Sequence, residues 1–129
     1  MKAAKTPIRC CRNVVVKMEA FNPGGSHKFR AAEYIVNNAL KTGRISATKS
    51  VRLLEKTGGN FGIGLACAAT KYGIGVDLVV GNSFLKSKKA LCKAYGTNLV
   101  GQTLSGQGPS ARRNHRKIAG QISKPVLFH

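Results

Sequence analysis

The stretch "LLEKTGGNFGIGLACAA", residues 53–69, runs from an apolar strand-like segment through two glycines into a helix-like segment. The same alternation of apolar patterns extends along the rest of the chain. Strands are predicted at 13–19, 50–55, 76–80, 97–102 and 124–128, and helices at 27–41, 61–72, 83–95 and 109–121. Helices of this length between consecutive strands require parallel pairing with right-handed crossovers. The sequence therefore predicts one α/β domain over residues 1–129, an open parallel sheet with helices on both faces.

Short polar residues precede the predicted helices, and glycines follow them. The expected N-caps are Ser26, Asn60 and Ser83, and the expected terminating glycines are Gly43, Gly73 and Gly96. A side-chain oxygen at the first position accepts an unpaired helix N–H, and a glycine at the last position adopts the left-handed conformation that ends a helix.

Composition restricts the function classes. No apolar run is long enough for a membrane span, and the N-terminal "MKAAKTPIRCCRN" has no apolar core of a signal peptide, so we expect a cytoplasmic protein. The four cysteines show neither C-x-x-C nor zinc-ligand spacing, so we expect free thiols and no metal site.

The net charge of +18 is the unusual feature, since 22 Lys and Arg face only four acids. Such a field attracts anions, including nucleic acid. The densest basic groups, 86–89 and 112–117, fall on predicted helices, where solvated helix faces account for them equally well. One hypothesis is therefore a non-catalytic basic α/β protein that binds anions, nucleic acid or a protein partner. The few aromatic residues are not interleaved with the basic groups, so base stacking is not indicated.

The glycines of the 53–69 stretch also suggest a dinucleotide site, but their order argues against it. Gly59, Gly62 and Gly64 give G-x-x-G-x-G, and Asp77 begins the next predicted strand rather than ending it. Capture of a carboxylate or phosphate by backbone N–H groups at the helix N-terminus remains the physical expectation.

A second loop, "FNPGGSHKFRAA" at residues 21–32, places Lys28 in the first turn of a predicted helix. The helix dipole and the neighbouring Arg30 disfavour an ammonium there, and partial burial would lower the lysine pKa further. A lysine of this kind can act as a neutral nucleophile, and Gly24 and Gly25 let the backbone approach a flat cofactor. The alternative is an ordinary solvated helix residue.

Both loops resemble one family. "KMEAFNPGGSHKFRAA" is similar to the pattern K-x-E-x-x-N-P-x-G-S-x-K-x-R of fold-type II pyridoxal-phosphate enzymes, the tryptophan-synthase-β-like superfamily, and especially of cysteine synthase and cystathionine β-synthase. The matching positions are Lys17, Glu19, Asn22, Pro23, Gly25, Ser26, Lys28 and Arg30. "TGGNFGIGLA" resembles the T-S-G-N-T-G-I-G-L-A of that family, and "KKALCKAYGTNLV" resembles a later helix–strand segment.

The resemblance implies a set of roles. Lys28 would bind pyridoxal 5′-phosphate covalently and then act as acid and base at the substrate α-carbon. Asn60 would hydrogen-bond the 3′ oxygen of the cofactor, and His27 would lie near its phosphate. The carboxylate of an amino-acid substrate would be held by Thr57, Gly58, Gly59, Asn60 and Phe61. The implied reaction is β-elimination and β-replacement on a serine-derived amino acid.

The chain also departs from the family pattern. Gly58 and Phe61 stand where the family has Ser and Thr, so two hydroxyls that could contact substrate are missing, and the substrate stays open. The family's glycine-rich phosphate cradle lies in a second half that this sequence does not match. The resemblance is thus to the N-terminal half of such an enzyme. A truncated chain would be incomplete or inactive alone and would regain a site as a homo-oligomer or with a complementing second chain.

Overall fold

The computed structural model describes residues 7–46, 51–57, 59–81, 83–100 and 125–127. Its elements are β1 (Ile8–Cys11), β2 (Val14–Lys17), the one-turn 3-10 helices η1 (Glu19–Phe21) and η2 (Pro23–Gly25), α1 (Lys28–Lys41), β3 (Arg52–Lys56), α2 (Asn60–Thr70), β4 (Gly75–Val79), α3 (Lys86–Ala94), β5 (Asn98–Val100) and β6 (Pro125–Leu127). Within these ranges, no helix is both long and apolar enough to cross a membrane.

The main sheet has four strands in the order β5-β4-β3-β6, all parallel. Leu54 of β3 pairs with Asp77 of β4 on one side and with Leu127 of β6 on the other. The predicted open parallel α/β sheet is confirmed. The helix predicted at 109–121 lies outside the described residues.

The strand order reverses at β3. From β3 the chain moves outward through β4 to β5, and it later returns to the other side of β3 as β6. In open α/β sheets, ligands bind beyond the carboxyl ends of the strands at such a switch point. The loop that leaves β3 there begins at Thr57.

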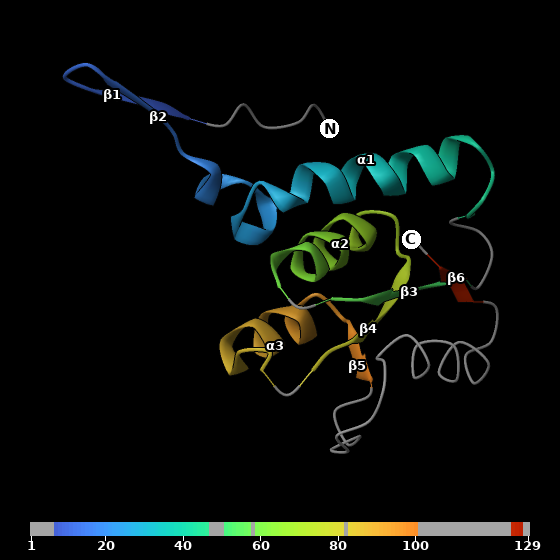
Figure 1. Ribbon diagram of the computed structural model, residues 1–129. Helices are drawn as coiled ribbons and strands as arrows, with labels where there is room; N and C mark the ends of the chain where they lie inside the picture. The colour runs from blue at the N-terminus through green and yellow to red at the C-terminus, as the bar shows by residue number, and fades with distance from the viewer. Residues whose placement is uncertain (1–6, 47–50, 58, 82, 101–124, 128–129) are drawn as a thin grey trace.

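Helix α2 forms the middle layer of the described structure. It packs on β4, and α1 lies against its outer side, as Figure 1 shows. Because α2 is covered from both sides, it is apolar nearly all round. Its buried residues are Gly62, Ile63, Gly64, Leu65, Ala66, Ala68 and Ala69. Helix α1 contributes a stripe of Ala32, Val36 and Ala39 to the same core.

The first predicted strand belongs to a different sheet. Val14–Lys17 pairs antiparallel with Ile8–Cys11, a strand that the sequence did not predict, and the two form a separate hairpin. The expectation that 13–19 joins the parallel sheet is therefore wrong. A connection as short as Arg12 and Asn13 can only reverse the chain into an antiparallel pair, and Arg12 takes a φ of 51° to close it.

The helix starts also differ from the prediction. His27, not Ser26, occupies the N-cap of α1, and the Ser26 hydroxyl is buried with no hydrogen-bond partner among the described residues. Asn60 is the first residue of α2, and α3 begins at Lys86 rather than near Ser83. The terminating glycines are confirmed, because Gly43, Gly73 and Gly96 all have positive φ.

A polar cluster fixes three strands of the sheet. Arg52 of β3 donates two 2.7 Å bonds to Asp77 of β4, from Nε to Oδ2 and from a terminal nitrogen to Oδ1. Asn98 of β5 donates to Asp77 Oδ1 at 2.9 Å. Asp77 is only 2% exposed, so these donors compensate the cost of burying its charge. The pKa of Arg52 is raised, chiefly by its bond to Asp77.

Candidate active site

The two glycine-containing loops lie together because α1 rests directly on α2 at Gly64. A Cβ at Gly64 would lie 3.0 Å from Phe29 Cα and 3.2 Å from the carbonyl carbon of Lys28. A Cβ at Gly24, in the turn before α1, would lie 3.5 Å from Gly64 Cα. A side chain at this position of α2 would prevent this approach. Gly64 therefore determines the position of the first turn of α1, which includes Lys28.

Thr57 shapes the loop between β3 and α2. Its Oγ1 accepts hydrogen bonds from Gly62 N at 3.1 Å and from Gly59 N at 3.3 Å, and its own N–H donates to the Val79 carbonyl at 3.1 Å. A Cβ at Gly62 would lie 2.3 Å from Thr57 Cγ2, so Gly62 leaves the space that this side chain fills. Thr57, rather than Asn60, therefore supplies the side-chain cap of α2.

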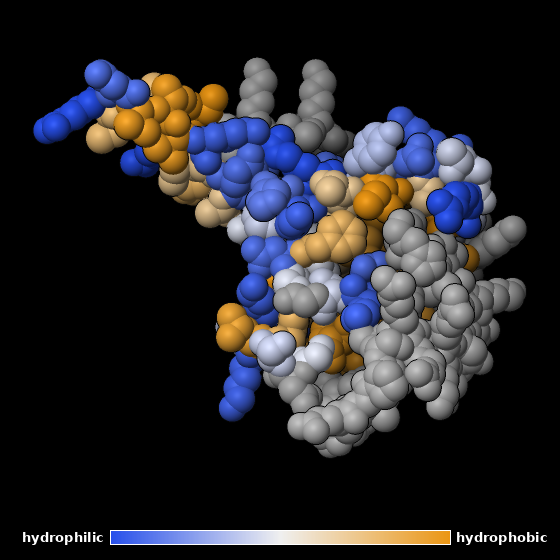
Figure 2. Space-filling model, viewed as in Figure 1, coloured by the Kyte–Doolittle hydropathy of each residue, from blue (hydrophilic) through white to orange (hydrophobic). Residues whose placement is uncertain are grey.

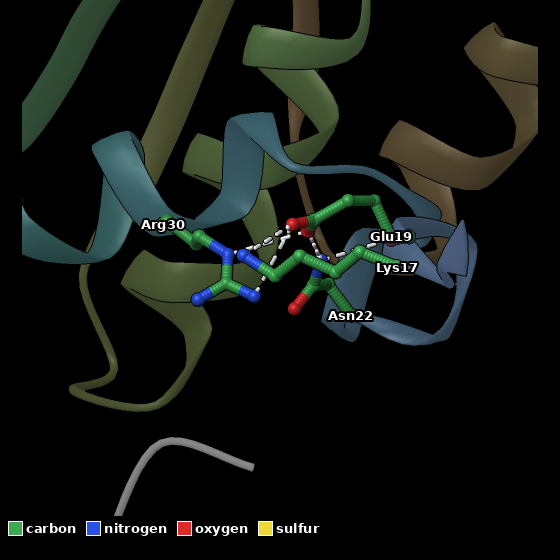
Figure 3. Close-up of polar contacts among 4 residues, drawn as sticks. All are labelled: Lys17, Glu19, Asn22 and Arg30. Atoms are coloured by element: carbon green, nitrogen blue, oxygen red, sulfur yellow. Dashed lines mark hydrogen bonds and ion pairs between the residues drawn. The ribbon is translucent and has the colours of Figure 1, made fainter. Parts of the chain in front are cut away.

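A charged cluster, made by Lys17, Glu19, Asn22 and Arg30, holds the segment that leads into α1 (Figure 3). Lys17 Nζ lies 2.9 Å from Glu19 Oε1, and Arg30 Nε donates to Glu19 Oε2 at 3.2 Å. Asn22 Nδ2 donates to the Glu19 carbonyl at 2.9 Å and also to its carboxylate. The cluster ties β2, the 3-10 turns and the first turn of α1 to one another.

Its cations and amide stabilise the ionised carboxylate of Glu19. They lower its pKa from 4.5 to about 2, with the Lys17 contact as the largest cause and those of Asn22 and Arg30 after it. The sequence pattern contains all four residues of the cluster, but it gave no signal that they meet. Their contacts depend on the chain reversal through η1 and η2, which brings Arg30 back to Glu19.

Lys28 itself is exposed on the first turn of α1. We expected Lys28 to be partly buried. Among the residues that the structure describes, this expectation is wrong. The reason is that α2 packs against the backbone of Lys28, through Gly64, and not against its side chain.

The other predicted site residues lie around the same two helix N-termini. His27 is the exposed N-cap of α1, and Asn60 is exposed as the first residue of α2. Gly59 is the N-cap of α2, and Phe61 is half-buried with its ring against the hydrophobic core. Gly58 lies outside the described residues. The helix N-termini that bear Lys28 and Asn60 thus form one edge of the molecule, at the carboxyl end of β3.

Glu55 is a titratable residue that the sequence did not single out. It lies on β3, two residues before Thr57, and pairs in register with Leu78. Burial raises its pKa from 4.5 to about 7. The signal available in the sequence was a lone acid in an apolar strand, in a chain that has only four acids.

A lysine at a helix N-terminus, beside a glycine-rich loop at the switch point of a parallel sheet, places the chain among the open α/β proteins, whose ligands bind at such a point. The family described as pyridoxal-phosphate dependent enzyme matches residues 2–129, and the chain belongs to this family.

Relatives with curated descriptions agree. A cysteine synthase of Helicobacter pylori is 32% identical over 121 residues, which cover 94% of this chain and 39% of that protein. An O-acetylserine dependent cystathionine beta-synthase of Bacillus subtilis is 36% identical over 87 residues, 67% of this chain and 28% of that protein. The chain thus spans about two fifths or less of the length of these relatives.

Solved structures show the same fold. The O-acetylserine dependent cystathionine beta-synthase of Helicobacter pylori superposes with a TM-score of 0.80 at 28% identity, over 97% of this chain and 44% of that one. The cysteine synthase of Entamoeba histolytica gives a TM-score of 0.79 at 25% identity, over 97% and 40%. The predicted resemblance to the N-terminal half of fold-type II enzymes is confirmed.

The residues present fit one side of pyridoxal phosphate. The exposed amine of Lys28 and the exposed amide of Asn60 lie at one edge, next to the N–H groups that begin α2. These groups suit a carbonyl, a ring oxygen and a carboxylate, respectively.

Proposed function

We propose that this chain supplies the lysine and the carboxylate-binding loop of a pyridoxal-phosphate enzyme of the cysteine synthase type, which performs β-elimination and β-replacement on a serine-derived amino acid. The observation that carries the proposal is the contact at Gly64, which holds the backbone of Lys28 one helical turn from Asn60. Family membership and the cysteine synthase and cystathionine beta-synthase activities of the relatives support the reaction class.

Each residue has a role in this proposal. The amine of Lys28 binds the cofactor and afterwards exchanges a proton with the substrate α-carbon. The Asn60 amide would hold the 3′ oxygen of the cofactor, and His27 would help to hold its phosphate. Pyridoxal phosphate, when bound, withdraws electrons from the α-carbon.

The substrate carboxylate is held by the loop from Thr57 to Phe61. Since the Thr57 hydroxyl already accepts from Gly59 and Gly62, we assign to it the shaping of the loop. The binding itself falls to backbone N–H groups at the positive end of α2. Phe61 packs on the core and offers no hydroxyl to the substrate.

In this proposal, a second polypeptide segment supplies the other half of the site, which covers the cofactor. Hairpin β1–β2 carries apolar side chains that are exposed on both faces, among them Ile8, Val14 and Val15. Figure 2 shows apolar side chains gathered on the projecting hairpin. The occupant that we propose is the part of the family fold that lies beyond this chain's match in the relatives, supplied by a complementing chain.

The test is covalent capture of pyridoxal phosphate. The chain is incubated with the cofactor, reduced with borohydride, digested and mapped by mass spectrometry. Lys28 is expected to carry the label, Lys28→Ala to lose it, and Lys41→Ala, at the exposed far end of α1, to keep it.

Labelling spread evenly over the surface lysines would contradict a specific site. Together with strongly salt-dependent binding of DNA or RNA, that result would favour the non-catalytic basic protein instead. The salt dependence of nucleic-acid binding has to be measured because the charge of +18 predicts some anion binding under both candidate functions.

A further inference from the structure

One of the four acidic residues of the chain lacks a cationic partner. Glu19, Glu33 and Asp77 each form an ion pair with a lysine or an arginine, at 2.9, 3.9 and 2.7 Å. Glu55, the fourth acid, forms neither an ion pair nor a hydrogen bond within the described ranges. The chain has 22 Lys and Arg, so the unpaired state of Glu55 does not follow from a shortage of cations.

Glu55 lies at the carboxyl end of β3, the strand at which the order of the sheet reverses. Because side chains alternate along a strand, Glu55 shares a face with Leu53, which packs in the core, and with Thr57, which caps α2. The side chain is half-buried. Ligands of open parallel sheets bind at this edge, so a group from outside the chain can approach the carboxyl group here.

Partial burial makes Glu55 a favourable position for such a group to bind. Burial raises the pKa of Glu55 to about 7, whereas the cations around Glu19 lower the pKa of that residue to about 2. A cation brought to Glu55 would oppose the effect of burial and stabilise the carboxylate. Because solvent ions screen a partly buried pair less than an exposed one, the pair would also persist at physiological ionic strength.

The surroundings of Glu55 suit an organic cation rather than a metal ion. Mg²⁺ and Ca²⁺ take several oxygen ligands, and the part of the chain that the structure describes holds no group of three or more His, Cys, Asp or Glu that could bind a metal. An ammonium or a guanidinium brings its own N–H donors and can bind to a single carboxylate. The group that fits is therefore the side chain of a lysine or an arginine.

The proposed function supplies the source of this cation. The chain covers 39% of the Helicobacter pylori cysteine synthase, and a complementing chain provides the rest of the family fold. The charge of +18 repels most cations of such a partner, whereas an unpaired acid attracts one of them. Repulsion elsewhere and attraction at one position together select a single register between the two chains.

We propose that Glu55 pairs with a lysine or arginine of the complementing chain and so fixes the position of that chain at the carboxyl end of β3. The proposal deepens the proposed function and rests on it. It adds a charged contact to the apolar hairpin surface, at a different place in the fold.

The test measures how fast the complementing half dissociates. The probe is the part of the Helicobacter pylori cysteine synthase beyond its match to this chain, co-expressed with the tagged chain and captured with it on affinity resin. Glu55→Gln is expected to raise the dissociation rate about tenfold, and the control Glu33→Gln, which removes the same charge from α1, to change it less than about twofold. Glu55→Gln also removes a half-buried charge, so loss of folding would not explain faster dissociation.

A double-mutant cycle identifies the cation. Each lysine and arginine of the probe is replaced in turn by alanine, and each replacement is combined with Glu55→Gln. One replacement is expected to accelerate dissociation as Glu55→Gln does and to add little to it in combination. Fully additive effects for every cation of the probe would overturn the ion pair.

The titration of the Glu55 carboxyl group, followed by carbon-13 NMR, is the second readout. Its pKa is expected near 7 in the isolated chain and well below that value in the complex. An unchanged pKa in the complex would refute the proposal, and so would a pKa below 4.5 in the isolated chain, since a cation of the same chain would then already pair with Glu55.

The dissociation experiment separates this inference from the proposed function. Equal rates for the unmodified chain, Glu55→Gln and Glu33→Gln would refute the role of Glu55 and leave the complementing half in place. Failure of the unmodified chain to capture the probe would contradict the complementing half itself, and the inference with it.

Discussion

The "KMEAFNPGGSHKFRAA" stretch contains one residue to which we assign the chemistry and others that hold the backbone around it. Lys28 is exposed, whereas Glu19, Asn22 and Arg30 bond to one another and hold the approach to α1. The spacing predicted Lys28 and Asn60 at two helix starts, and the structure places both there. The charged cluster could not be predicted, because Arg30 meets Glu19 only after the chain has turned through two short 3-10 helices.

Glu55 gives a prediction about pH. Its folded pKa of about 7 lies above the ordinary value of 4.5, because burial disfavours the carboxylate. Its contribution to stability is therefore greatest below pH 4.5 and is lost as the pH rises through 7. At acid pH, Glu55→Gln is expected to have the same denaturant midpoint as the unmodified chain. In alkaline solution, its denaturant midpoint is expected to be higher.

The matched control is Glu33→Gln, since Glu33 is an acid on the outer helix, 3.9 Å from Lys71. The difference in midpoint between Glu55→Gln and the unmodified chain is expected to vary more with pH than the difference for Glu33→Gln. A Glu55→Gln variant that differs from the unmodified chain equally at every pH would mean that Glu55 does not titrate in this range.

At the scale of elements, two glycines of α2 have structural roles that their order in the sequence does not indicate. The G-x-x-G-x-G order argued against a dinucleotide loop, but it did not show that Gly62 makes room for Thr57 and Gly64 for α1. The β-branched run at 14–16 suits a buried parallel strand and a hairpin strand equally well, and this ambiguity led to the wrong sheet. Parallel order within β3, β4 and β5 was predictable, because the helices between them dictate it.

Gly64→Ala tests the contact between α1 and α2. The added methyl group would lie 3.0 Å from backbone atoms of Phe29, which cannot move aside as a flexible side chain could. The expected loss of unfolding free energy is about 1–3 kcal/mol, typical of overpacking. Borohydride-trapped labelling at Lys28 should fall as well.

Gly81→Ala is the control, since its Cβ would meet nothing closer than Ser83 Oγ at 4.0 Å. It is expected to change stability and labelling little. Equal effects of the two substitutions on chemical denaturation would show that close approach at Gly64 does not position α1.

At the scale of the whole molecule, the chain resembles part of a larger fold. It superposes along 97% of its own length on 44% of a solved relative, and its hairpin leaves Ile8, Val14 and Val15 in solvent. Apolar side chains gathered on a projecting element usually mark an interaction surface. A two-stranded hairpin is at best marginally stable alone, so β1–β2 is expected to gain order from a partner.

Val15→Lys tests that surface. Val15 is 68% exposed, and the control Tyr34→Lys replaces a side chain that is 70% exposed on α1 and adds the same charge. The probe is the part of the Helicobacter pylori cysteine synthase that lies beyond its match to this chain, co-expressed with the tagged chain. The unmodified chain and Tyr34→Lys are expected to retain the probe on affinity resin, and Val15→Lys to lose it.

Equal retention by all three would place the interface away from the hairpin. No retention by any of them would contradict a complementing half of this type.

The middle position of α2 also has a consequence for biosynthesis. The apolar stripe of α1 is made first, yet the surface that it covers belongs to residues 60–70, which leave the ribosome later. Until Thr70 has left the ribosome, α2 cannot cover Val36 and Ala39, and both side chains are exposed to water. A nascent chain stalled within α2 should therefore recruit a holding chaperone, whereas one released past β4 should not.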